Sequence, residues 1–134
     1  AGKAIFSSRL GREEYLRAGM DHKFCIVAAG DYRNTGKYVE AILFASRGGC
    51  VPIFVSLSRH SLAFGSAIDY DRVALWSSAS SIGSNLDLWR RWSAEQVQPM
   101  MAYARKVGQF LDYDAAGVEQ TLREVCRRVR GPSG

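Results

Sequence analysis

Two almost uninterrupted apolar runs, separated by a stretch of helix length, constrain the fold of this chain more than any other feature. The first run covers residues 24–29, and the second covers residues 51–57 with Ser56 as its one polar residue. Neither run alternates between apolar and polar residues, which is typical of strands that are buried on both faces of a parallel sheet. Pro52 is compatible with such a strand only near its start or at a sheet edge.

The stretch between the two runs has the spacing of a helix that begins near Lys37. Val39, Ile42, Leu43 and Ser46 fall on one stripe of this helix. Turn-forming residues 30–36 precede the helix, and the glycine pair 48–49 is suited to end it. This order of elements predicts a right-handed βαβ unit over about residues 23–57: a strand, a glycine turn, a helix, a glycine cap and a second strand. The expected fold class is therefore α/β, a small Rossmann-like domain with a short parallel sheet.

Patterns outside this unit are weaker. Residues 3–7 and 72–76 are compatible with short strands, residues 11–19 with a short helix bounded by glycines, and the serine-rich residues 77–84 with a loop. The length of 134 residues suits one domain. We expect a single α/β domain over residues 1–130 and a fraying tail over residues 131–134.

The last third of the chain has helical patterns. One apolar stripe consists of Val97, Met100, Met101, Ala104, Val107 and Leu111. Ser93 and Gln96 can form a capping box at its start. Because Pro99 would remove a hydrogen bond inside this helix, we expect a kink there or a start near Gln98. A second helix, capped by Asp114, carries a basic face with Arg123, Arg127, Arg128 and Arg130.

Net charge and hydropathy limit the classes of partner that this chain can have. The formal net charge of +5 attracts nucleotides, nucleic acid or acidic lipid surfaces without selecting among them, and it also serves solubility. Every apolar run is far shorter than the ~20 residues that a membrane-spanning helix needs. The chain also begins without the apolar core of a signal peptide. We therefore expect no membrane partner.

Three cysteines, Cys25, Cys50 and Cys126, each lie among apolar neighbours. Their odd number and wide spacing favour buried thiols in a reducing compartment over a disulfide framework. No spacing typical of metal-binding cysteine and histidine residues is present, so we expect no metal site. These features predict a cytoplasmic protein.

The turn between the first strand and the helix is a candidate anion site. Residues 30–37 differ from a phosphate-binding loop, because one residue too many separates the glycines and Tyr38 replaces the magnesium-binding hydroxyl. Gly30 and Asp31, ahead of a helix N-terminus, can still present N–H groups to an anion. Glu40 follows in the first helical turn, at the sheet edge where ligands of open α/β sheets bind. A carboxylate there can meet a bound sugar, or it can simply stabilise the helix dipole.

The segment from Cys25 to Glu40, followed by Ala45, Gly48 and the Val-Pro-Ile of residues 51–53, resembles two related families over about residues 23–55. Nucleoside 2-deoxyribosyltransferases share the Asp/Gly turn, the Gly-x-x-x-Glu spacing and a later Gly-x-x-Val. Toll/interleukin-1 receptor (TIR) domains share an aromatic residue ahead of the helix glutamate and Val-Pro-Ile in the next strand.

This resemblance implies cleavage of an N-ribosyl bond. Glu40 would be the nucleophile or would stabilise the oxocarbenium ion, and Asp31 and Tyr38 would line the sugar site. NAD or a nucleoside would then be a substrate, and no cofactor is implied. The chain departs from the transferases at Lys37 and Phe44, where they have small residues.

Two further groups of residues can contact phosphates. Arg59 and His60 follow the second strand at the same predicted edge of the sheet. The segment Trp89, Arg90, Arg91 and Trp92 combines rings with cations, as in single-strand nucleic-acid binders, although helical spacing also suits its tryptophans to the core. No pattern of a Ser/His/Asp triad is present.

Two functions remain open on the sequence alone. The first is a domain that binds a nucleotide or nucleoside, with Glu40 at the N-ribosyl bond. The alternative is a non-catalytic basic module, such as a viral or ribonucleoprotein structural component, that binds nucleic acid or assembles as a homo-oligomer. Phosphate contacts in the alternative would come from residues 89–92 and from the arginines of the last helix.

Overall fold

A computed structural model describes residues 11–28 and 37–111. Its parallel strands β1 (Phe24–Ala28), β2 (Val51–Val55) and β3 (Leu75–Ser77) form one sheet in the order β1-β2-β3. The helices are α1 (Arg12–Asp21), α2 (Lys37–Ser46), α3 (Ile82–Trp89) and α4 (Ala94–Leu111), and a short 3-10 turn, η2, covers Arg59–Ser61. The α/β class, the parallel βαβ unit and, as far as residue 111, the helical C-terminal region predicted from the sequence are confirmed. The strand expected over residues 3–7 and the helix expected after Asp114 lie outside the described residues.

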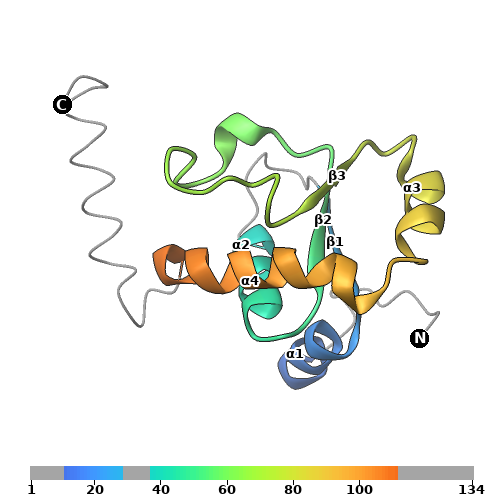
Figure 1. The fold of residues 1–134 in the computed structure, drawn as a ribbon, viewed down its shortest axis with the longest axis horizontal. Coiled ribbons are helices and arrows are strands. Elements are labelled where there is room, and N and C mark those ends of the chain that lie inside the picture. Colours follow the sequence, from blue (N-terminus) through green and yellow to red (C-terminus); the bar gives the residue numbers. More distant parts are fainter. Residues whose placement is uncertain (1–10, 29–36, 112–134) are drawn as a thin grey trace.

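The sheet lies between helices on its two faces (Figure 1). The helices α2 and α4 cross each other on one face, and α1 lies against α2. On the opposite face, Trp89 of α3 packs against Ile53 and Val55 of β2. The arrangement makes β2 the centre of the molecule, with all five of its residues buried.

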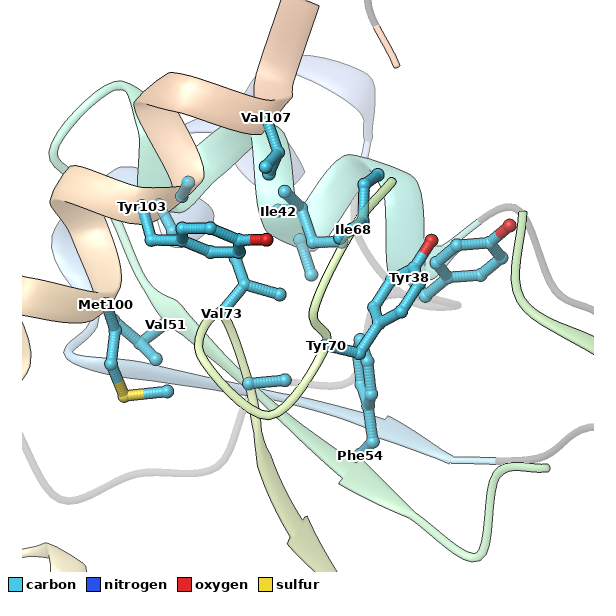
Figure 2. Packing of buried hydrophobic residues seen from close by; sticks show 14 of the residues in the cluster. Tyr38, Ile42, Val51, Phe54, Ile68, Tyr70, Val73, Met100, Tyr103 and Val107 are labelled. Atoms are coloured by element: carbon cyan, nitrogen blue, oxygen red, sulfur yellow. The ribbon is translucent and has the colours of Figure 1, made fainter. Parts of the chain in front are cut away.

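Phe54 of β2 is the focus of the main core. Its ring lies edge-on to Trp76, with ring centroids 5.1 Å apart, and edge-on to Tyr38, with centroids 6.4 Å apart. Figure 2 shows Phe54, Tyr38 and Tyr70 gathered beneath the α2 helix, with Ile42 beside them. Rings from a strand, a helix and a connecting segment therefore meet at one point.

The connection from β2 to β3, residues 56–74, contains only the short η2 turn, yet it belongs to the core. Its buried residues Leu62, Phe64, Ile68, Tyr70 and Val73 pack in the same cluster as α2 and α4. Tyrosine hydroxyls hold its backbone: Tyr38 accepts from the N–H of Ala63 (3.1 Å), and Tyr103 accepts from the N–H of Asp69 (2.7 Å). The hydroxyl of Tyr70 donates to the carbonyl of Ala63. Backbone N–H and C=O groups of this irregular connection are thus hydrogen-bonded by side chains of the core.

The expectation that β1 is buried on both faces is wrong. Only Val27 of this strand is buried, and the side chain of its central residue Ile26 is 54% exposed. Within the described residues β1 is an outer strand, and α3 covers β2 on that face while leaving Ile26 open. Pro52 fits as expected near the start of β2, because pairing with β3 begins only at Ile53.

The buried face of α2 is wider than the predicted stripe. Its buried residues are Tyr38, Ala41, Ile42, Phe44 and Ala45, whereas Val39, Leu43 and Ser46 are only partly buried. The reason is that α2 contacts the sheet, α4 and α1 at once, so burial extends around much of the helix. The predicted glycine end is confirmed, with Gly48 at a positive φ of 86°.

Element boundaries differ from expectation in the second half. The third strand begins at Leu75 rather than Arg72, and α3 begins inside the serine-rich segment that we expected to be a loop. Helix α4 begins at Ala94 and continues through Pro99, so the start near Gln98 is wrong. Pro99 has no N–H to donate to the carbonyl of Glu95, four residues earlier, but both residues are exposed, so water can satisfy that carbonyl. As expected for a capping box, the side chain of Gln96 accepts from the N–H of Ser93 (2.8 Å).

The expectation of three separate thiols is also wrong, because Cys25 and Cys50 form a disulfide. The parallel register pairs Phe24 with Val51, so the two cysteines, 25 residues apart in sequence, lie diagonally across the start of the ladder with their Cα atoms 5.5 Å apart. Cys126 lies outside the described residues. Since disulfides are typical of oxidising compartments, the cysteines no longer favour a cytoplasmic location.

The contact between α1 and the end of α2 depends on Gly49. A Cβ atom there would lie 2.6 Å from the carbonyl oxygen of Gly19 and 3.0 Å from that of Phe44. Because both are backbone atoms, we expect Gly49→Ala to lower the free energy of unfolding by about 1–3 kcal/mol, measured by urea denaturation. The control Gly65→Ala, where the nearest atom is 3.9 Å away, should change it by less than ~0.5 kcal/mol. Equal effects of the two substitutions would contradict this close approach.

Candidate functional site

The carboxyl-terminal ends of the three parallel strands lie at one edge of the sheet. After β1, the chain passes through residues 29–36, which lie outside the described residues, and enters α2. After β2 come Ser56, with a positive φ of 56°, and the η2 turn. After β3 comes a serine-rich turn that leads into α3. This edge is where ligands of open parallel sheets bind.

Glu40 projects from the first turn of α2, and its carboxylate accepts a hydrogen bond from the hydroxyl of Tyr15 (2.7 Å). Tyr15 comes from α1, and its ring packs edge-on against Phe44 with centroids 5.7 Å apart. Burial, together with the hydrogen bond and the charge of Glu40, raises the pKa of Tyr15 to about 12. The phenol therefore stays protonated and donates at neutral pH, while the exposed carboxylate remains open to solvent.

Tyr38, two positions before Glu40, points elsewhere. Its ring is buried against Phe54 and Tyr70, and its hydroxyl bonds the backbone of Ala63 (Figure 2). Residues two apart on a helix do not face each other, which explains why the two side chains diverge. The structure thus gives Tyr38 a packing role and does not bring its hydroxyl to Glu40.

Arg59 and His60 lie in η2, after β2. The guanidinium of Arg59 pairs with the carboxylate of Asp71 and stacks on Trp76, 3.9 Å from the ring centroid. His60 is exposed. A pocket of about 400 Å³ opens beside Arg59, lined by residues 65–70 and by Tyr103. Glu40, Tyr38 and His60 do not line this pocket, and Gly30 and Asp31 lie outside the described residues.

Hydroxyl groups gather in the turn between β3 and α3. Ser78 and Ser81 are 2.6 Å apart at their Oγ atoms, and the amide of Asn85 donates to Ser77 (3.0 Å). These contacts close the turn upon itself and position the start of α3. The run of serines predicted a loop over residues 77–84, and no local pattern in it indicated this hydrogen-bond network.

The residues of the alternative interface are divided between core and surface. Trp89 is buried beneath α3, so its ring is not presented for stacking. Trp92 is partly buried, and its carbonyl accepts a hydrogen bond from Lys23. Arg90 and Arg91 are exposed. The three arginines Arg123, Arg127 and Arg128 lie outside the described residues.

These features define the class of the protein: a small α/β domain whose parallel sheet carries, beside its carboxyl-terminal edge, a carboxylate held by a tyrosine. No protein-family model matches the chain, and neither a curated protein nor a solved structure matches it. In the described part of the chain, no cluster of histidine, cysteine and acidic side chains could hold a metal ion. None of the helices in residues 11–28 and 37–111 is long and apolar enough to cross a membrane.

Proposed function

We propose that this chain binds a nucleotide or nucleoside at the carboxyl-terminal edge of its sheet, with Glu40 accepting hydrogen bonds from the ribose hydroxyls. The observation that carries the proposal is the carboxylate of Glu40, which Tyr15 anchors at 2.7 Å. An ionised carboxylate has about four acceptor positions, and Tyr15 occupies one of them. The remaining positions suit the adjacent hydroxyls of a ribose ring.

Charge supports a phosphorylated ligand. The chain has a formal net charge of +5, which raises the local concentration of anions around it. His60 follows the strand next to β1 and exposes a hydrogen-bonding ring on that side of the molecule, beside Arg59, whose charge is paired with Asp71. The N-terminus of α2 adds the positive end of a helix dipole close to Glu40.

The same carboxylate supports a stronger form of the function, cleavage of the N-ribosyl bond. In that reaction the base departs with the bonding electron pair and positive charge develops at C1′. Water then adds its hydroxyl at C1′, and its remaining proton passes to the released base or to solvent. A carboxylate near C1′ stabilises this charge electrostatically. The resemblance over residues 23–55 supports this form, and chromatography of a nucleoside or NAD incubated with the protein would detect the released base.

Binding is the first test, measured by calorimetry with adenosine, ATP and NAD. We expect Glu40→Gln to weaken the affinity by about 10- to 100-fold, since a hydrogen bond to a charged group contributes roughly 1.5–3 kcal/mol. The matched control is Glu95→Gln, which removes a first-turn glutamate from α4 instead and should leave the affinity unchanged. Equal affinity of the wild type and Glu40→Gln would reject Glu40 as a ligand contact.

A second candidate is a basic module that binds nucleic acid or assembles with copies of itself. The exposed pair Arg90 and Arg91, at the end of α3, favours it. Binding of an oligonucleotide that weakens steeply with salt and does not depend on Glu40 would identify this function. For either candidate, a cytoplasmic location would favour the reduced form of the Cys25–Cys50 pair, because thiols are kept reduced in that compartment.

A further inference from the structure

The Cys25–Cys50 disulfide encloses the part of the chain that carries the proposed site. It joins the second residue of β1 to the residue before β2, and the two cysteines are 25 positions apart. The enclosed chain includes Gly30, Asp31 and the whole of α2 with Glu40. The position of β1 relative to β2 therefore sets the point at which the chain leaves the sheet on its way to α2.

Among the elements of the enclosed unit, β1 is the most weakly packed. Val27 is its one buried residue, whereas all five residues of β2 and five residues of α2 are buried. Within the described residues, β1 forms its ladder with β2 alone. Local stability follows buried apolar contacts, so the detachment of β1 costs less than the detachment of β2 or α2.

The two cysteines differ in access. Cys50 is fully buried, whereas Cys25 is partly buried on the weakly packed strand β1, so local opening of β1 is what exposes the bond to a reductant at Cys25. One thiolate of a small dithiol attacks Sγ of Cys25, which breaks the S–S bond and releases Cys50 as a thiolate that takes up a proton. The second thiol of the reductant then displaces Cys25. The protein gains two electrons and two protons, and the dithiol becomes a disulfide.

We propose that the Cys25–Cys50 disulfide is a redox-controlled clamp on β1. When a small dithiol opens it, β1 loosens from β2 while α2, β2 and α4 stay packed. The ligand site at Glu40, on the helix that follows β1, then loses affinity, a consequence that rests on the proposed function. The loosening of β1 stands independently of any ligand.

Peptide-resolved hydrogen–deuterium exchange of the full chain, with and without dithiothreitol, tests the clamp. Because loss of the cross-link also lowers the stability of the whole domain, amides of both strands should exchange faster, but the exchange rate of residues 24–28 relative to that of residues 51–55 should rise about 10-fold after reduction. The variant Cys25→Ala/Cys50→Ala should reproduce the reduced pattern, and Cys126→Ser should retain the response of the wild type. No change in residues 24–28, or an equal change in both strands, overturns the clamp.

Affinity for ATP, measured on the oxidised and the reduced protein, tests the consequence for the site. A decrease of about 10-fold on reduction, reversed by reoxidation, supports coupling between the clamp and the site. An unchanged affinity in a protein whose β1 has loosened overturns that coupling. If the oxidised protein binds none of ATP, adenosine and NAD, both the proposed function and the coupling are overturned. Hydrogen exchange alone then tests whether reduction loosens β1.

Discussion

Replacing Phe54 with alanine is expected to lower the free energy of unfolding by about 3–5 kcal/mol. Phe54 is 0% exposed, and on the central strand it meets Tyr38 and Tyr70 (Figure 2) as well as the ring of Trp76. These neighbours come from three different parts of the chain, so they cannot all move inward to fill the space. The loss combines a smaller hydrophobic transfer free energy with an unfilled cavity, and urea denaturation followed by circular dichroism measures it.

The control for this substitution is Leu88→Ala on α3. Leu88 is of similar size but is 59% exposed, so its removal should change the free energy of unfolding by less than ~0.5 kcal/mol. The comparison separates the effect of burial from that of hydrophobicity in general. A similar loss in both variants would contradict the placement of β2 at the centre of the molecule.

Removing the Cys25–Cys50 cross-link should have an effect of comparable size. Closing a loop of 25 residues is expected to stabilise the folded state by about 3.5 kcal/mol, because the cross-link lowers the entropy of the unfolded chain. Urea denaturation of the oxidised protein and of Cys25→Ala/Cys50→Ala measures the difference.

Thiol titration of the unfolded, unreduced protein provides the check on this second prediction. The chain has three cysteines and one disulfide joins two of them, so one thiol should react per chain. Three reactive thiols, or equal stability of the two proteins, would contradict the cross-link. The variant Cys126→Ala should keep the stability of the wild type.

The sequence alone predicted the parallel βαβ unit because the unit is local: two apolar runs, a helix between them and glycines at the turns. The same pattern failed at β1, where a continuous apolar run does not mean burial on both faces. Whether a strand has neighbours on both sides depends on the rest of the fold. For this reason residues 51–55 met the expectation and Ile26 did not.

Glu40 and its place in the first turn of α2 were predictable, whereas its partner was not. Tyr15 reaches Glu40 only because α1 packs closely against α2 near Gly19 and Gly49, a contact between segments that no local pattern encodes. The pairing of Cys25 with Cys50 likewise depends on strand register. In contrast, the burial of Trp89 follows the helical spacing that the sequence already contained.

The connection between β2 and β3 has a consequence for how this protein can vary. Connecting segments usually tolerate insertions, because they lie on the surface and water satisfies their backbone. Here the backbone at Ala63 and Asp69 is bonded by hydroxyls of Tyr38 and Tyr103, whose rings are fixed in the core. An added residue in this stretch would separate those partners. We therefore expect the connection to tolerate insertions as poorly as a strand or a helix does, although it has little regular secondary structure.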